Sequence, residues 1–75
     1  MNEARCAICG DSIVMVDEAR LPRGAWWGTY DRESGRVWTP SAWELMGLSD
    51  AIRAQLRALH SRCISRVREA KRSRQ

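Results

Sequence analysis

Two short motifs near opposite ends of the chain, Cys6-Ala7-Ile8-Cys9 and His60-Ser61-Arg62-Cys63, decide how this sequence folds. Each motif places two residues between its outer pair, and together they hold all three cysteines and the one histidine of the 75 residues. Three sulfurs and one imidazole are the complement of a closed tetrahedral zinc site. The spacing predicts that one ion joins an N-terminal turn, relaxed by Gly10, to a C-terminal helix, on which positions three apart project together.

These four residues also admit other interpretations. Cys6 and Cys9 could form a thioredoxin-type redox pair, but the sequence lacks the βαβ context, and a secreted disulfide framework would leave one cysteine over. His60 and Cys63 could be ordinary helix and core residues. A core this small supplies roughly 3–5 kcal/mol, whereas structural zinc is worth on the order of 10–16 kcal/mol in finger peptides. We expect one structural Zn²⁺, with an iron–sulfur centre or a metal-free cluster as alternatives.

Between the two motifs, short apolar and polar stretches alternate. The apolar run 13–16, which is rich in β-branched residues, predicts a strand, and the polar stretch 17–24, which contains proline and glycine, predicts a loop. Residues 26–30 and 36–39 flank a five-residue connection that ends in glycine. This pattern predicts a β-hairpin.

Helix signals begin at Pro40. Ser41 and Glu44 have the spacing of a capping box, and Gly47 is placed to end a short helix over about 40–46. Ser49 is a suitable N-cap for a second helix, whose apolar residues recur every three or four positions and predict one face nearly twenty residues long. That predicted face consists of Leu48, Ile52, Leu56, Leu59, Cys63 and Val67.

The order of these elements resembles the treble-clef class of zinc finger: a Cys-x2-Cys-Gly knuckle, then a hairpin, then a helix with the second ligand pair. The stretch 59–63 resembles the His-x2-Cys helix of small prokaryotic and phage fingers, and the resemblance implies the same four metal ligands. Two features depart from the pattern: the added short helix, and a ligand pair inside a long helix instead of in its first turn. We expect a small zinc-stapled α+β domain over residues 1–72 (zinc knuckle, β-hairpin, short helix, long C-terminal helix), with a frayed basic tail at 73–75.

Positive charge is concentrated in the C-terminal third. Residues 1–48 hold five arginines against seven acidic residues, whereas 49–75 hold eight basic residues against two acidic ones, and the whole chain is +4. Arginine grips phosphate or carboxylate at two points, although codon bias gives the same excess over lysine. The predicted long helix would present these residues beside its apolar face, as a contact surface or simply as a solvated one. The candidate contact residues are Arg53, Arg57, Arg62, Arg66, Arg68, Lys71 and Arg72.

Four tryptophans and no phenylalanine make up an unusual aromatic set. We expect Trp38 and Trp43 to lie in the core. Trp26 and Trp27 are adjacent on a predicted strand and must face opposite sides, so we expect them to offer stacking platforms for bases or anchors for a partner.

Several function classes are disfavoured. A closed zinc site leaves no position for an activated water, and the one histidine is used as a ligand, so we expect neither catalysis nor a small-molecule substrate. The longest apolar run, 13–16, is too short to cross a membrane, and the N-terminus does not read as an export signal, so we expect a cytoplasmic chain. The sequence favours a zinc-containing module that binds nucleic acid or is associated with transcription. The alternative is an adaptor or inhibitor, such as a phage-encoded one, that docks on an acidic surface of a larger protein.

Overall fold

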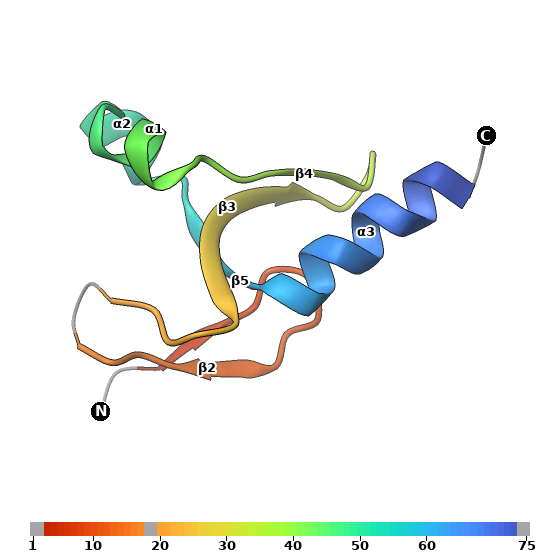
Figure 1. Cartoon of the computed structure of the whole chain (residues 1–75), viewed down its shortest axis with the longest axis horizontal. Coiled ribbons are helices and arrows are strands. Elements are labelled where there is room, and N and C mark those ends of the chain that lie inside the picture. The colour runs from red at the N-terminus through yellow and green to blue at the C-terminus, as the bar shows by residue number, and fades with distance from the viewer. Residues whose placement is uncertain (1–2, 18–19, 74–75) are drawn as a thin grey trace.

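The computed structural model describes residues 3–17 and 20–73, with side chains through residue 70 (Figure 1). The elements form a two-stranded hairpin and a three-stranded sheet with the order β4-β3-β5. The final helix contacts both edge strands, β4 and β5, and the first strand contacts β5. In chain order the elements are β1 (Glu3–Arg5), β2 (Ser12–Val14), β3 (Ala25–Asp31), β4 (Arg36–Trp38), α1 (Ala42–Met46), α2 (Asp50–Arg53), β5 (Arg57–His60) and α3 (Ser61–Ser73).

The first hairpin contains the Cys-x2-Cys motif in its turn. β1 and β2 pair antiparallel, with Ala4 opposite Ile13, and the Cys6 N–H donates to the Asp11 carbonyl at 2.9 Å. Gly10 has φ +82°, a conformation that residues with a Cβ rarely adopt, and its N–H returns to the Cys6 carbonyl. The predicted tight turn and short strand are confirmed. The predicted loop 17–24 holds an isolated bridge between Asp17 and Arg20, and its residues 18–19 lie outside the described part.

The second hairpin, β3 and β4, is also confirmed. Asp31 pairs with Arg36, and the Asp31 carboxylate accepts hydrogen bonds from the Glu33 N–H at 3.0 Å and the Ser34 hydroxyl at 2.9 Å. At Gly28 the strands approach so closely that a Cβ would meet the Trp38 carbonyl oxygen and the Leu59 side chain. This glycine therefore allows β3 to lie between its neighbours.

The prediction of one long helix after Ser49 is wrong, because the chain forms α2, β5 and α3 instead. β5 pairs antiparallel with β3 from Gly28–Arg57 to Ala25–His60. Ala58 and Leu59 point to opposite faces of this sheet, and both are buried, Leu59 completely. Tertiary pairing that buries both faces of β5 outweighs the local preference for helix. Because β5 interrupts the predicted helix, His60 lies at the end of a strand and Cys63 lies in the first turn of α3.

The two short helices begin where the sequence predicts, but neither contributes a buried residue to the core. Ser41 and Glu44 make the capping box, and Ser49 accepts a hydrogen bond from the Ile52 N–H. Trp43 on α1 is 83% exposed and Trp38 on β4 is 39% exposed, so the expectation that both lie in the core is wrong. Figure 1 shows the reason for Trp43: α1 and α2 form a lobe apart from the sheet and α3.

The core is small and surrounds the cysteines. Leu59 and Pro40 are its fully buried large side chains among the described residues. One cluster of buried residues packs where β1, β2, β3, β5 and α3 meet, and it comprises Cys6, Ile13, Ala25, Ala58 and Cys63. Because two of these five are cysteines, the core and the candidate metal ligands occupy the same place.

Candidate metal centre

The β1–β2 turn supplies the first pair of candidate ligands. Its hydrogen bonds, from the Cys6 N–H to the Asp11 carbonyl and from the Gly10 N–H to the Cys6 carbonyl, close the six-residue segment 6–11 that contains both cysteines. The Ala7 N–H donates to the Ala58 carbonyl at 3.1 Å, which ties this turn to β5. The turn is thereby fixed against the strand that carries the second pair.

The junction of β5 and α3 supplies the second pair. His60 ends the strand opposite Ala25, and the Ser61 N–H donates to the Gly24 carbonyl at 2.8 Å. The chain turns into α3 at this point, and Cys63 lies in the first turn of the helix, buried against the core. Strand pairing therefore sets the position of His60, and the start of the helix sets that of Cys63.

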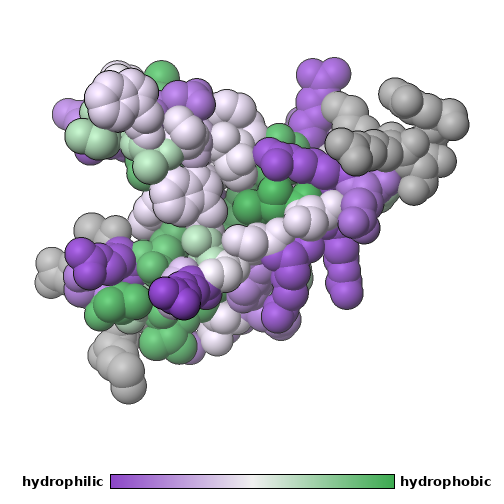
Figure 2. Space-filling view, in the orientation of Figure 1, coloured by the Kyte–Doolittle hydropathy of each residue, from purple (hydrophilic) through white to green (hydrophobic). Residues whose placement is uncertain are grey.

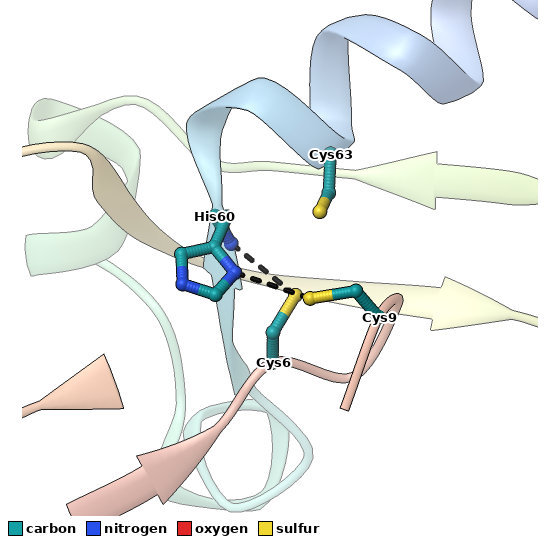
Figure 3. Close-up of side chains that lie close together, drawn as sticks. All are labelled: Cys6, Cys9, His60 and Cys63. Atoms are coloured by element: carbon teal, nitrogen blue, oxygen red, sulfur yellow. Dashed lines mark hydrogen bonds between the residues drawn. The ribbon is translucent and has the colours of Figure 1, made fainter. Parts of the chain in front are cut away.

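The four side chains converge on one point (Figure 3). Their ligand atoms all lie within 4.8 Å of one another, and Cys9 Sγ is 3.3 Å from His60 Nδ1. A tetrahedral zinc ion with ordinary bond lengths spaces its ligand atoms roughly 3.5–3.8 Å apart. The predicted set Cys6, Cys9, His60 and Cys63 is thus brought together in an arrangement positioned for a metal ion and compatible with zinc.

The Cys6 thiol is held in a setting that favours the thiolate. Burial alone would raise its pKa, but the backbone N–H groups of Cys9, His60 and Ile8 and the Cys9 side chain hydrogen-bond to it and lower the pKa to about 6. The His60 N–H donates to Cys6 Sγ at 3.4 Å. Cys6 is therefore largely ionised at neutral pH and ready to bind a cation.

Cys63 is in the opposite situation. Burial, together with the neighbouring Cys9 and Cys6 sulfurs, beside which a second negative charge is unfavourable, raises the pKa of its thiol to about 11. A cation among the three sulfurs would remove this repulsion. Metal binding must therefore release the Cys63 proton, and metal affinity falls as the pH falls.

The cluster is closed on one side and open on the other. Cys6 and Cys63 are buried, His60 is half-buried and Cys9 is exposed. The Arg62 guanidinium lies 3.7 Å from the Asp11 carboxylate beside the cluster, and both side chains are solvent-exposed. Such an exposed pair contributes little to stability. An ion would enter from the Cys9 side.

The candidate contact arginines do not form one helical ridge, because they lie on three elements. Arg53 on α2 donates to the Leu45 and Met46 carbonyls at the end of α1, at 3.0 and 3.1 Å. Arg57 on β5 donates to the Ala54 and Leu56 carbonyls that follow α2. The prediction that one long helix presents all the candidates is thus wrong, and Arg53 and Arg57 satisfy carbonyls at helix ends.

The remaining candidates lie on α3. Arg62 and Arg66 are exposed, and the Arg68 guanidinium donates to the Thr39 hydroxyl at 3.1 Å. The side chains of Lys71 and Arg72 lie outside the described part. A contact role for these residues stays a prediction.

Trp26 and Trp27 are both half-buried in β3. The Trp26 indole N–H donates to the Pro40 carbonyl at 2.6 Å, which fastens the chain before α1 to the sheet. Sequence reasoning missed this role, and it missed the contribution of the β5 backbone to the metal centre. Neither has a local signal, because Trp26 bonds a residue fourteen positions away and the position of β5 depends on its pairing with β3.

No protein-family model matches the chain, and no curated protein or solved structure matches it either. Among the described residues, no helix is long and apolar enough to cross a membrane. The likeness to treble-clef fingers therefore rests on the order of elements and on the four ligands alone.

Proposed function

We propose that this chain is a treble-clef-type zinc domain in which one structural Zn²⁺ joins the β1–β2 turn to the β5–α3 junction. One observation carries the proposal: four side chains from opposite ends of the sequence meet within 4.8 Å, with no other cysteine or histidine in the chain. The position of Cys63 in the first turn of α3 also supports it, because the second ligand pair of a treble clef lies at the start of its helix.

The donor set favours zinc over the alternatives. Three thiolates and one imidazole form a common structural zinc site. Iron–sulfur clusters take four cysteines, or two cysteines and two histidines in the Rieske type, and a multi-atom cluster holds its ligands further apart than one ion does. With all four positions filled by protein, the ion has a structural role, and the domain acts by binding and not by catalysis.

Native mass spectrometry of the purified chain tests the zinc assignment. We expect one zinc per chain, and we expect chelation to remove the far-ultraviolet circular dichroism of the folded state. A chain that is purified without zinc and keeps the same spectrum after chelation would overturn the assignment.

The proposed binding partner is nucleic acid, contacted through α3. This helix contains five basic residues and one acidic residue, a net charge equal to that of the whole chain. Figure 2 shows hydrophilic side chains spread along α3 away from the apolar core. Arg62 and Arg66 are exposed there, and Arg68 lies between them and the basic end of the helix. The two arginines that cap helix ends, Arg53 and Arg57, are not part of this surface.

Fluorescence anisotropy of labelled duplex and single-stranded nucleic acid tests this partner at about 50 and about 200 mM salt. Three or four phosphate contacts predict that affinity for the better ligand falls by about 40- to 150-fold between the two salt concentrations. Arg66→Glu should weaken binding about tenfold, whereas Arg32→Glu, the same change in the exposed β3–β4 turn, should leave it unchanged. Absence of binding at the lower salt concentration, or equal loss in both variants, would refute the proposal.

A further inference from the structure

The α1–α2 lobe carries apolar side chains that the domain does not bury. Trp43 is 83% exposed, Met46 74% and Ile52 42%, and neither helix contains a buried residue. The lobe is nevertheless firmly built: each helix has an N-cap, and Arg53 satisfies the carbonyls at the end of α1. An ordered apolar surface that adds nothing to the core marks a contact site.

A groove runs from this lobe across the sheet. One pocket of about 410 Å³ lies between α1, α2 and β3, and a second of about 350 Å³ lies between β3 and the segment after Arg20. Both are lined by Trp27 and Leu45, so the two pockets adjoin at these side chains. Figure 2 shows a notch in the molecular outline between the α1–α2 lobe and the β1–β2 side. We call the two adjoining pockets the Trp27 groove.

The charges along the Trp27 groove are all of one sign. Its floor is apolar, formed around Trp27 and Leu45 by Leu21, Pro22, Met46 and Leu56. Arg20 and Arg23 lie at one end and Arg53 at the other. No acidic residue is among the described residues that line it. An occupant must therefore bring apolar side chains to the middle and carboxylates to both ends.

We propose that the Trp27 groove binds an acidic segment of a partner protein, with apolar anchor side chains seated on Trp27 and Leu45. Each pocket has the volume of a ligand site and suits one large side chain. The Arg53 guanidinium is already held by two carbonyls, so little side-chain entropy is lost when a carboxylate binds it. No α3 residue lines the groove, so this surface is separate from the proposed nucleic-acid surface.

The test is selection from a displayed library of random 12-residue peptides on the purified full chain. A selected peptide is then synthesised and its affinity measured by anisotropy. We expect the selected peptides to be enriched in Asp and Glu around Trp, Phe or Leu. Met46→Glu should weaken binding at least tenfold, because it places a negative charge in the groove at an exposed position that the fold does not need. Ala51→Glu adds the same charge outside the groove and should change affinity less than twofold.

A second pair of variants tests the charge complementarity. Arg20→Glu with Arg23→Glu should abolish binding, whereas Arg32→Glu with Arg36→Glu, the same charge change at the turn and the start of β4, should not. Arg66→Glu should leave peptide binding intact, which separates this proposal from the role of α3.

Enrichment of basic peptides, or equal binding to the Met46→Glu variant, would overturn the proposal. Sedimentation could also overturn it, by showing a concentration-dependent dimer that the Met46→Glu substitution dissociates. The occupant of the groove would then be a second copy of the chain.

Discussion

The metal centre and the α1–α2 lobe are stabilised in opposite ways. At the metal centre, residues more than fifty positions apart in sequence meet within 4.8 Å, and two of the ligands are also core residues. In the lobe, every stabilising contact named above is local: two N-caps, and an arginine that reaches back to the preceding helix. This chain therefore divides into a part held together by long-range contacts at the metal centre, on which the fold depends, and a locally stabilised part that is free to present side chains.

Loss of a metal ligand should have the largest effect. Cys63→Ser removes a buried thiolate from the cluster, and structural zinc is worth on the order of 10–16 kcal/mol in small fingers, more than a core of this size supplies. We expect the variant to be largely unfolded by circular dichroism and to contain no stoichiometric zinc. Ser65→Ala, an exposed change on the same helix, serves as the control and should fold normally. A well-folded Cys63→Ser variant would remove the distinction between the two regions.

A pair of glycine substitutions compares the two regions directly. An added Cβ at Gly28 would meet the Trp38 carbonyl and the Leu59 side chain, so Gly28→Ala should lower the free energy of unfolding by about 1–3 kcal/mol or more. At Gly47, which follows α1, an added Cβ would lie 3.7 Å from the Glu44 carbonyl oxygen, an ordinary contact. Gly47→Ala should therefore change the free energy of unfolding by less than about 0.5 kcal/mol. Urea denaturation of the zinc-bound chain measures both. Equal losses would show that the lobe is as tightly packed as the sheet.

Acidification should weaken zinc binding at the metal centre and leave the α1–α2 lobe unchanged. Because the pKa of the Cys63 thiol is raised to about 11, zinc binding near neutral pH must release its proton, and this proton alone should make affinity fall by at least about tenfold per pH unit. Below about pH 6 the decline should steepen, since the Cys6 thiolate, whose pKa is lowered to about 6, also takes up a proton. Competition with a zinc chelator between pH 5.5 and 8 measures this slope. An affinity that does not change with pH would contradict the assignment of Cys63 as a ligand.

The smallest effect is expected from the cap of α1. Ser41→Ala removes the side chain that accepts the Glu44 N–H at 3.1 Å, a change worth about 1 kcal/mol of helix stability. Since the lobe contributes no buried residue, this loss should stay local. Amide exchange in α1 should accelerate, while zinc content and exchange in β3 stay as they are. If β3 exchange accelerates as well, the lobe is coupled to the sheet more strongly than its contacts indicate.

Local signals in the sequence account for much of this structure. The ligand spacing, the glycine-ended hairpin turn and the Ser41–Glu44 capping box were each predicted from a few adjacent residues, and each is present. The four ligands could be named because the chain contains no other cysteine or histidine.

Non-local packing explains what the sequence did not predict. Leu56, Leu59 and Cys63 have helical spacing, but the same residues fit a short strand followed by a helix once β3 is available for pairing. Trp43 was expected in the core because it is large and apolar, yet a helix held by its own caps needs no burial. The Trp27 groove combines residues from four separate segments, and no local pattern identifies it.

X-ray absorption at the zinc edge of the purified chain is the most direct test of a single zinc ion bound by Cys6, Cys9, His60 and Cys63. The geometry predicts four ligands: three sulfurs at about 2.3 Å and one imidazole nitrogen at about 2.0–2.1 Å. A shell dominated by oxygen and nitrogen, or one with fewer than three sulfurs, would contradict the metal centre on which the fold and the proposed function both rest.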